Sequence, residues 1–547
     1  MKKNNSLFTL YIIIFLCLVF LPSKGLAFTR IIDIIFKGEP VKPDDLENVI
    51  ETAKKNKLKN EKNGSKRPDQ LIPVIARLPK PDNIQLEIDT SGVLVKGEKD
   101  IQAAISNQGF LDAITEAVNL WDDVTEAKIT FAPLKFASGQ PNPEDGKNVI
   151  TSRAIQKLEG VADGTPAVSI VTFAKTDTVT FMNKIIMVKP GTILDADVVF
   201  DPTNAPCLAL FTTVGNFKIG GNNLPISEGG IDPTADPSLC NAVSTADITD
   251  LAVRAIGNIL GLESSAIASS ANSPVALIMT KYSLTSDDKI GLANIYPDKN
   301  NLTDTGTVAG KVLLNKSPVR GAHVVLVDSE TGEPTASTIT DLSGKFQIKY
   351  IPAGTYNVYA EPLDGPTRKN SLTRNFYGLT AETNFTTGVF PDQILVSSKK
   401  KTSITINVKE LSASAFNINY LTAALTEDDV NKSGGGFFLP IRIMPGETLT
   451  DVQFWGSNIS PDFGTLSISG MGVTVSNIRE DTNISISTFM GDPLPQVLPG
   501  IVVDITCSAN TSPGPRNIIF TGDSSDPEAP SFGLIDQITG GLIVTGP

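Results

Sequence analysis

Apolar residues recur at helical spacing in two separate segments of the chain. In residues 112–125, four apolar side chains repeat every three or four positions, and a wider stripe of the same period crosses residues 248–260. Ser244 with Asp247 has the pattern of a capping box, and Gly261 stands where a C-terminal cap glycine belongs. We therefore expect one helix over 112–125 and a second from near Ser244 to residue 260.

Alternating apolar and polar residues predict strands on either side of these helices. The alternation has the two-residue period of a half-buried strand. It occurs at residues 72–78, 84–89, 128–134, 167–174 and 196–201. Strands mixed with helices over this length indicate an α+β domain, which we place at residues 71–298.

From residue 303 onward, short alternating segments follow one another, separated by Gly, Asp and Pro turns. This pattern is typical of all-β sandwiches. The expected strands are 307–314, 322–328, 344–350, 355–362, 403–410, 437–443, 450–456, 464–470, 472–478, 501–507 and 516–522. We divide them into two domains, 303–410 and 411–547. The predicted fold class is therefore multidomain, one α+β domain followed by two all-β sandwich domains.

Length and charge limit the classes of partner. A chain of 547 residues exceeds what a single core usually supports, which agrees with three domains. The formal net charge is −13, and the only basic stretch of any length is 53–67. Because phosphate binding needs clustered cations, this balance argues against nucleic acid as a partner.

The N-terminus has the features of an export signal. Lys2 and Lys3 precede an apolar run, and Gly25-Leu26-Ala27 supplies small residues for cleavage, so residues 1–27 are interpreted as a signal peptide. The alternative is an uncleaved membrane anchor. Residues 28–70 begin with a short apolar stretch and continue without periodicity, which indicates a linker, or else a propeptide-like segment. No later stretch is apolar enough to span a membrane, so the mature chain is expected to be exported: extracellular, on the cell surface or periplasmic.

Export permits disulfide bonds, and two cysteines are placed to form one. Cys207 and Cys240 flank a Gly- and Asn-rich excursion in the first domain, and we expect them to be bridged. Cys507 alternates with Ile501, Val503 and Ile505 on one face of a strand, which predicts a buried free thiol.

The segment 252–265, AVRAIGNILGLESS, resembles the zinc-binding helix of the matrixin branch of the metzincin metalloproteases, including its modular bacterial members. In that family H-E-x-x-H-x-x-G-x-x-H supplies three zinc ligands and a general base. Here Arg254 and Asn258 stand at the first two ligand positions, Ala255 at the base and Ser264 at the third ligand. Further points of resemblance are the segments 119–131, 195–201 and 283–297, and NSPVALIMTKY, which places Met279 at the family's Met-turn.

What the resemblance implies is a metzincin-like domain that has lost its metal. The chain holds one histidine, His323, and it lies in the next domain, so a three-histidine site cannot form within one chain. Arg254 is a permanent cation at a position where zinc would need a neutral ligand. A structural role for Arg254 and Asn258, such as a salt bridge from Arg254 or a hydrogen bond from Asn258 to a neighbouring strand, is the alternative to a role in binding a ligand.

The other two domains also resemble known families. Residues 303–410 are similar to the carboxypeptidase regulatory-like (transthyretin-type) sandwich, through VAGKV, SPVRGAHVVLVD, TDLSGKF and IPAGTYNVYAEP. Asp341 and Gly344 supply the chemistry of a turn there, and His323 is interpreted as a residue of the sheet rather than a catalyst. Residues 411–547 are similar to immunoglobulin-like IPT/TIG modules, through MPGETLTDVQFWGSNIS and GMGVTVSNI.

The function expected from these patterns is that of an exported modular pseudo-metalloprotease with a binding or scaffolding role and no peptide hydrolysis. Its partner would be a protein or cell-surface ligand held through the β-sandwich domains, and no cofactor is expected. The alternative is an active secreted hydrolase, either a metallopeptidase that binds zinc through unusual ligands or an enzyme based on a pair of carboxylates.

Overall fold

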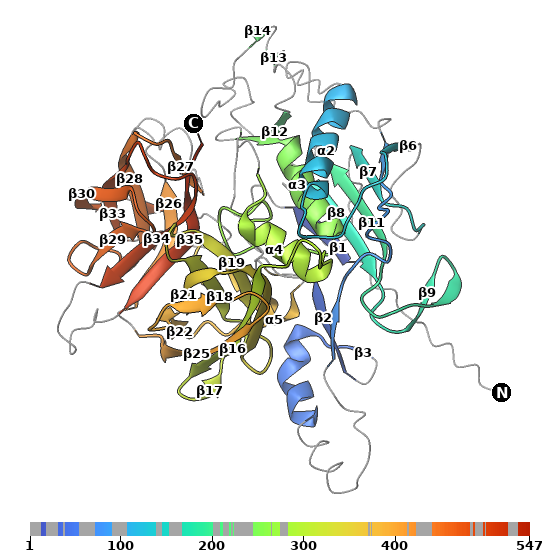
Figure 1. The fold of residues 1–547 in the computed structure, drawn as a ribbon, viewed down its shortest axis with the longest axis horizontal. Coiled ribbons are helices and arrows are strands. Elements are labelled where there is room, and N and C mark those ends of the chain that lie inside the picture. Colours follow the sequence, from blue (N-terminus) through green and yellow to red (C-terminus); the bar gives the residue numbers. More distant parts are fainter. Residues whose placement is uncertain are drawn as a thin grey trace, which may run out of the picture.

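The computed structural model forms three connected regions that follow the chain from its N-terminus to its C-terminus (Figure 1). It describes residues 13–17, 31–36, 39–53, 72–89, 107–137, 145–152, 167–200, 208–211, 218–219, 222–223, 244–263, 265–273, 283–369, 372, 375–412, 415–422, 440–481, 485–486, 496–497, 499–522 and 534–546. The molecule is multidomain and mostly β, and its longer helices belong to the N-terminal half.

The first region is built on a six-stranded mixed sheet. Its strand order is β1 (Ile13–Cys17), β8 (Ala167–Phe173), β11 (Ile193–Phe200), β7 (Val149–Ser152), β5 (Glu87–Asp89) and β6 (Lys135–Ala137). Because β1 lies within the segment interpreted as a signal peptide, cleavage after residue 27 would leave the other five strands of this sheet. The strands from β11 to β6 run parallel, whereas β8 is antiparallel to both of its neighbours. The described residues of this region also form three two-stranded sheets: β9 (Thr178–Phe181) with β10 (Lys184–Met187), β12 (Leu208–Phe211) with β15 (Ser244–Asp247), and β13 (Lys218–Ile219) with β14 (Asn222–Asn223).

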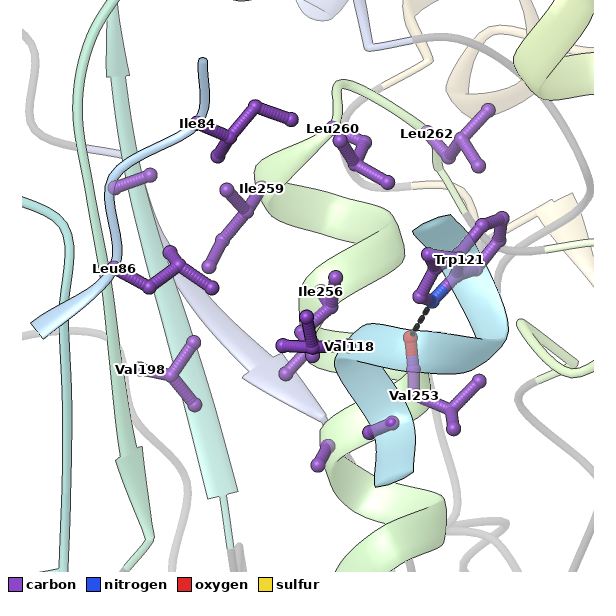
Figure 2. Packing of buried hydrophobic residues seen from close by; sticks show 14 of the residues in the cluster. Ile84, Leu86, Val118, Trp121, Val198, Val253, Ile256, Ile259, Leu260 and Leu262 are labelled. Atoms are coloured by element: carbon purple, nitrogen blue, oxygen red, sulfur yellow. Dashed lines mark hydrogen bonds between the residues drawn. The ribbon is translucent and has the colours of Figure 1, made fainter. Parts of the chain in front are cut away.

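Two helices pack together beside this sheet: α2 (Asn107–Asp122) and α3 (Ile248–Ile259). Figure 2 shows their apolar side chains meeting those of the sheet, with Val118 and Ile256 between the helices and Val198 on the strand. Trp121 is fully buried, and its indole Nε1 donates to the carbonyl oxygen of Val253 at 2.8 Å. The predicted apolar stripes are therefore the faces that build this core.

Two local predictions in this region were wrong. Residues 244–247 form strand β15, which pairs with β12, so α3 begins at Ile248. The pairing of residues 244–247 with the distant strand β12 thus overrides the local tendency of Ser244 to cap a helix. Residues 128–134 form only an isolated bridge, between Phe131 and Ile84, and the strand β6 comes directly after them.

Part of the segment predicted to be a linker is folded. Residues 32–36 form β2, which pairs with β3 (Glu39–Pro40) and β4 (Ile72–Ile75), and a 3-10 turn at Pro43–Asp45 leads into a helix over 46–53. Ile34, Val41 and Leu46 pack against Phe376 of the second domain. The apolar side chains before residue 47 supply the burial that a solvated linker lacks.

The second region is a β-sandwich. One sheet contains β17 (Ser317–Pro318), β16 (Thr305–Leu314), β25 (Lys401–Glu410) and β22 (Phe385–Thr386), with β20 (Lys345–Pro352) paired to β16. The other contains β19 (Pro334–Ile339), β18 (His323–Asp328), β21 (Gly354–Glu361) and β23 (Gly388–Val389), with β24 (Ile394–Val396) on β21. Alternate side chains of both sheets, such as Val324, Phe346 and Ile406, form the core.

The turn predicted at 341–344 is present. The Asp341 carboxylate accepts from the backbone N–H groups of Ser343 and Lys345, and Gly344 has a φ of +66°. Helix α4 (Ser286–Ile295) packs against β19 and β20 of this sandwich, and the short helix α5 (Phe376–Leu379) contacts β2 and, through Tyr377, Ile339 of β19. The first of these has the capping box, formed by Thr285 and Asp288, that the sequence had suggested for α3.

The third region is a second sandwich. Its sheets are β26 (Asn417–Thr422), β28 (Thr448–Ser457), β33 (Gly500–Cys507) and β30 (Val473–Asp481), and β27 (Ile441–Ile443), β35 (Ile535–Val544), β34 (Gly514–Gly522) and β29 (Gly464–Ile468). The strands β31 (Ser485–Ile486) and β32 (Gln496–Val497) pair with each other as a separate antiparallel two-stranded sheet. Cys507 is a buried free thiol, as predicted.

Candidate functional site

Helix α3 buries the positions that resemble a zinc site. Arg254, Ala255 and Asn258 are 6%, 1% and 2% exposed, and every residue of α3 is buried. The amide Nδ2 of Asn258 donates to the carbonyl oxygen of Arg254 at 2.7 Å, one turn back on the same helix, rather than to a neighbouring strand. Arg254 also has an interaction partner. The side chains of Arg254, Ala255 and Asn258 therefore lie in the interior of the domain, where they are packed against other residues.

The end of α3 is held by three close contacts. Gly261 has a φ of +89°, and a Cβ placed on it would lie 2.5 Å from the carbonyl oxygen of Ala76. The hydroxyl of Tyr296 donates to the carbonyl oxygen of Leu260 at 2.8 Å and accepts from the N–H of Leu78 at 2.7 Å. Burial raises the pKa of Tyr296 above its usual value, so the phenol stays protonated and keeps both bonds.

Several predicted site residues lie outside the described part of the chain. Ser264, Met279, Cys207 and Cys240 are among them, so the third ligand position, the Met-turn and the disulfide stay predictions. Within the residues that the structure describes, no group of three or more His, Cys, Asp or Glu side chains is arranged to hold a metal ion. In the same part of the chain, no helix has both the length and the apolar character needed to cross a bilayer.

Acidic side chains gather on the sheet of the first domain. Asp89, Asp195 and Asp197 are all fully buried. Asp195 Oδ2 accepts from the N–H of Gly146 at 2.7 Å, and Asp197 Oδ1 accepts from the N–H of Val149 at 2.9 Å. Burial, and then the charge of Asp197, raise the pKa of Asp195 to about 8. Because these groups are not exposed, they can orient loops but cannot reach a substrate from their present positions.

A polar network joins the second domain to the third. His323 Nδ1 lies 2.7 Å from Glu361 Oε1, and the hydroxyl of Thr539 donates to the same oxygen at 2.9 Å. Thr539 also shares a hydrogen bond of 2.7 Å with the hydroxyl of Tyr359, which accepts from Asn517 Nδ2 at 3.0 Å. His323 has no exposed surface, so it is a residue of the sheet and the interface, not a group that could meet a substrate.

Two further carboxyl groups lie beside this network. Burial, followed by the charge of Glu361, raises the pKa of Asp364 to about 7. Burial, followed by the charge of Asp364, raises the pKa of Asp536 well above its usual range. Sequence reasoning missed the network, since Glu361 meets His323 only through the register of β18 with β21.

Comparisons with known proteins support part of the sequence interpretation. The model of the carboxypeptidase regulatory-like domain family matches residues 306–386, which confirms the resemblance for most of the second domain. This match does not extend to residues 71–298, so the metzincin resemblance stays a hypothesis. No curated protein matches the chain.

Solved structures similar to the chain include bacterial pilins. They include the minor pilin GBS52 of Streptococcus agalactiae (13% identity, TM-score 0.14, 20% of this chain and 46% of that one). Another is the major pilin BcpA of Bacillus cereus (10% identity, TM-score 0.15, 44% and 69%). A match outside the pilins is the 5-hydroxyisourate hydrolase of Klebsiella pneumoniae (22% identity, TM-score 0.12, 20% of this chain and 94% of that one). The chain thus spans less than half of GBS52, and at TM-scores this low the similarity assigns no function.

Proposed function

We propose that the chain is an exported, noncatalytic binding or scaffolding protein whose first domain is a degenerate matrixin-type metalloprotease fold. The observation that carries this proposal is the burial of Arg254 and Asn258, one turn apart on α3, where the resemblance places zinc ligands. Two unit charges at 4 Å interact by about 4 kcal/mol at an effective dielectric of 20, and a divalent ion would double the repulsion from Arg254. A zinc ion would therefore be disfavoured there.

The surroundings of α3 support descent from such a fold. A mixed sheet lies behind the helix, Gly261 makes the turn after it, and Tyr296 closes the domain by binding the carbonyl oxygen of Leu260. Ala255, at 1% exposure, fills the position of the general base with a methyl group. The framework of the site is thus retained, while the groups that would activate water are replaced.

The two sandwiches are the proposed binding elements. We infer a protein or cell-surface ligand as the partner, and an exported location, from the signal peptide interpretation of residues 1–27. The hydrogen bonds of Thr539 to Tyr359 and Glu361 favour a scaffold in which the sandwiches are presented at a fixed angle.

The first test measures zinc and proteolysis. Elemental analysis of the purified mature protein should find no stoichiometric zinc, and an unfolded protein substrate should not be cleaved in a chelator-sensitive manner. The reason is that neutral imidazoles are missing at all three ligand positions. A wild-type protein that holds about one zinc per chain and loses activity with a chelator would overturn the noncatalytic proposal.

A variant that restores the ligands tests the proposed descent. We expect the triple variant Arg254→His, Asn258→His, Ser264→His, once shown by circular dichroism to fold, to bind about one zinc per chain. Arg254→His alone is the control and should bind none at comparable affinity. A folded triple variant without zinc would contradict the matrixin geometry.

A further inference from the structure

A groove of about 730 Å³ runs between the first and second domains, and lysine side chains line it. Its floor is the outer face of β16, β20 and β25, and α4 and α5 contribute to its walls. Lys311, Lys345, Lys349 and Lys401 all line it and are all exposed. Although the net charge of the protein is −13, four lysine side chains are thus concentrated on this one concave surface.

Strand register arranges these lysines at the two ends of the floor. Lys311 and Lys345 are direct partners across β16 and β20. At the other end, Lys349 and Lys401 both pair with Thr307, from opposite sides of β16. Lys345 and Lys349 are four residues apart on one strand, which corresponds to about 13 Å. The anionic groups of a matching ligand would be separated by a similar distance.

Between the two ends, the floor carries small uncharged polar groups. Midway between the ends, Gln347 and Ser403 pair with Ala309 from its two sides, and at the first end Thr405 pairs with Lys311. These amide and hydroxyl side chains can donate and accept hydrogen bonds. The floor therefore offers neutral hydrogen bonding flanked by positive charge.

The arrangement has a cost that folding alone does not explain. Like charges directly opposite each other on paired strands destabilise a sheet, and Lys311 faces Lys345 in that way. Among the described residues, no ion pair neutralises any of the four lysines. Asp341 also lines the groove, but its Oδ1 is occupied by the turn, where it accepts from Ser343 and Lys345 N–H groups. Two like charges that face each other across paired strands, with no ion pair to neutralise them, indicate that the lysines are kept for a function rather than for folding.

The walls favour side-chain recognition over the addition of a peptide strand. A peptide that extends a sheet needs a free strand edge. At Lys349 the edge of β20 is occupied, because Asn294 Nδ2 of α4 donates to its carbonyl oxygen at 3.0 Å and Asn294 Oδ1 accepts from its N–H at 3.4 Å. Next to Lys349, the face of the sheet is therefore the part open to a ligand, and ammonium, hydroxyl and amide side chains line the groove there.

We propose that this groove binds an acidic polysaccharide, with carboxylates of nonadjacent sugar units at the two lysine pairs and ring hydroxyls over Gln347 and Ser403. Sugar hydroxyls match the neutral polar floor, and the carboxylates supply the missing counter-charge. The inference deepens the binding role proposed above and rests on it only for the absence of catalysis. Zinc in the wild-type protein would overturn the noncatalytic proposal and leave this one standing.

The test uses polygalacturonate as the probe and isothermal titration calorimetry as the measurement. The full mature chain should bind it, and binding should weaken as salt is raised. The double variant Lys345→Gln, Lys401→Gln should bind at least about tenfold more weakly, since one charge-assisted contact is removed at each end. The double variant Lys128→Gln, Lys409→Gln changes the net charge equally at exposed positions outside the groove and should bind as the wild type does.

Four results would overturn the proposal. One is the absence of polygalacturonate binding to the wild type, and another is equal weakening in both double variants. The third is tighter binding of poly-glutamate than of polygalacturonate, which would assign the groove to an acidic peptide. Neutral dextran should not bind, and binding of dextran with the affinity of polygalacturonate would show that the lysines are not the recognition element.

Discussion

At the scale of single residues, the first domain buries two carboxyl groups, Asp195 and Asp197, two positions apart on one strand. Asp195 and Asp197 lie on β11 and accept hydrogen bonds from the N–H groups of Gly146 and Val149, which hold the start of β7 and the turn before it in place. The raised pKa of Asp195 follows from burial first and from Asp197 second. An acid whose pKa is higher in the folded protein than in the unfolded chain destabilises the folded state at each pH where only the unfolded chain has lost the proton.

The first consequence is a pH dependence of stability. Asp195 has a pKa of about 8 in the folded protein and an ordinary value of 3.8, so the folded state holds a proton that the unfolded state has lost between these values. Stability should therefore fall as pH rises through this interval, by at most about 1.4 kcal/mol per pH unit. Asp195→Asn, which keeps an acceptor for Gly146, should reduce the loss between pH 5 and pH 8.

Urea unfolding at both pH values measures this effect. Asp177→Asn, at an exposed position, is the matched control and should leave the slope of the wild type unchanged. Identical slopes for the wild type and Asp195→Asn would refute the assignment.

At the scale of elements, the end of α3 determines how the helix meets the rest of the domain. Gly261 turns the chain away from the helix, and its backbone approaches β4 and the residues after it closely enough that Ala76 leaves no room for a side chain. Trp121 ties the middle of α3 to α2 through the carbonyl oxygen of Val253 (Figure 2). A single helix is thus anchored from two directions.

Gly261→Ala should destabilise the protein substantially. The left-handed conformation alone costs a residue with a Cβ about 1 kcal/mol, and the contact with the Ala76 carbonyl oxygen adds steric strain. Thermal unfolding measures the effect. Gly365→Ala is the control, since the nearest atom to its added Cβ is 3.8 Å away, and it should change the melting temperature little. Equal melting temperatures for the two variants would contradict the steric account.

At the scale of the whole molecule, the three domains meet around one strand of the third. The carbonyl oxygen of Thr539 accepts from the N–H of Ala268 in the first domain, and its hydroxyl bonds Glu361 and Tyr359 in the second. Between the first and second domains, the carboxylate of Asp287 accepts a hydrogen bond from the N–H of Ser337 at 2.7 Å. These contacts predict that the domains unfold in a coupled manner.

Tyr359→Phe should weaken that coupling. It removes the hydroxyl that bonds both Thr539 and Asn517 of the third domain, at a cost of about 1–2 kcal/mol. We expect calorimetry to show the third domain unfolding at a lower temperature than the second. Tyr356→Phe, on the same strand, loses only a bond to Pro352 within the second domain and should lower stability without separating the transitions. Matching calorimetric profiles for the two variants would exclude the coupling role.

The local pattern of apolar and polar residues was sufficient to predict those features whose structure depends on residues close together in the sequence. The alternation in 303–410, the turn at Asp341 and Gly344, and the buried face of β33 that ends at Cys507 all depend on residues within a few positions of one another. For the same reason the apolar stripe of α3 was predictable, although its start at Ile248 was not.

Sequence alone therefore determined the multidomain, β-rich organisation and the single histidine that excludes a three-histidine zinc site. Only the tertiary structure decided that Glu361 meets His323, that Arg254 is buried, and that four lysines share one groove. Each of these depends on strand register or on packing between residues far apart in the chain. Periodicity carries no information about such pairings, because it records which face of an element is apolar and not what that face will meet.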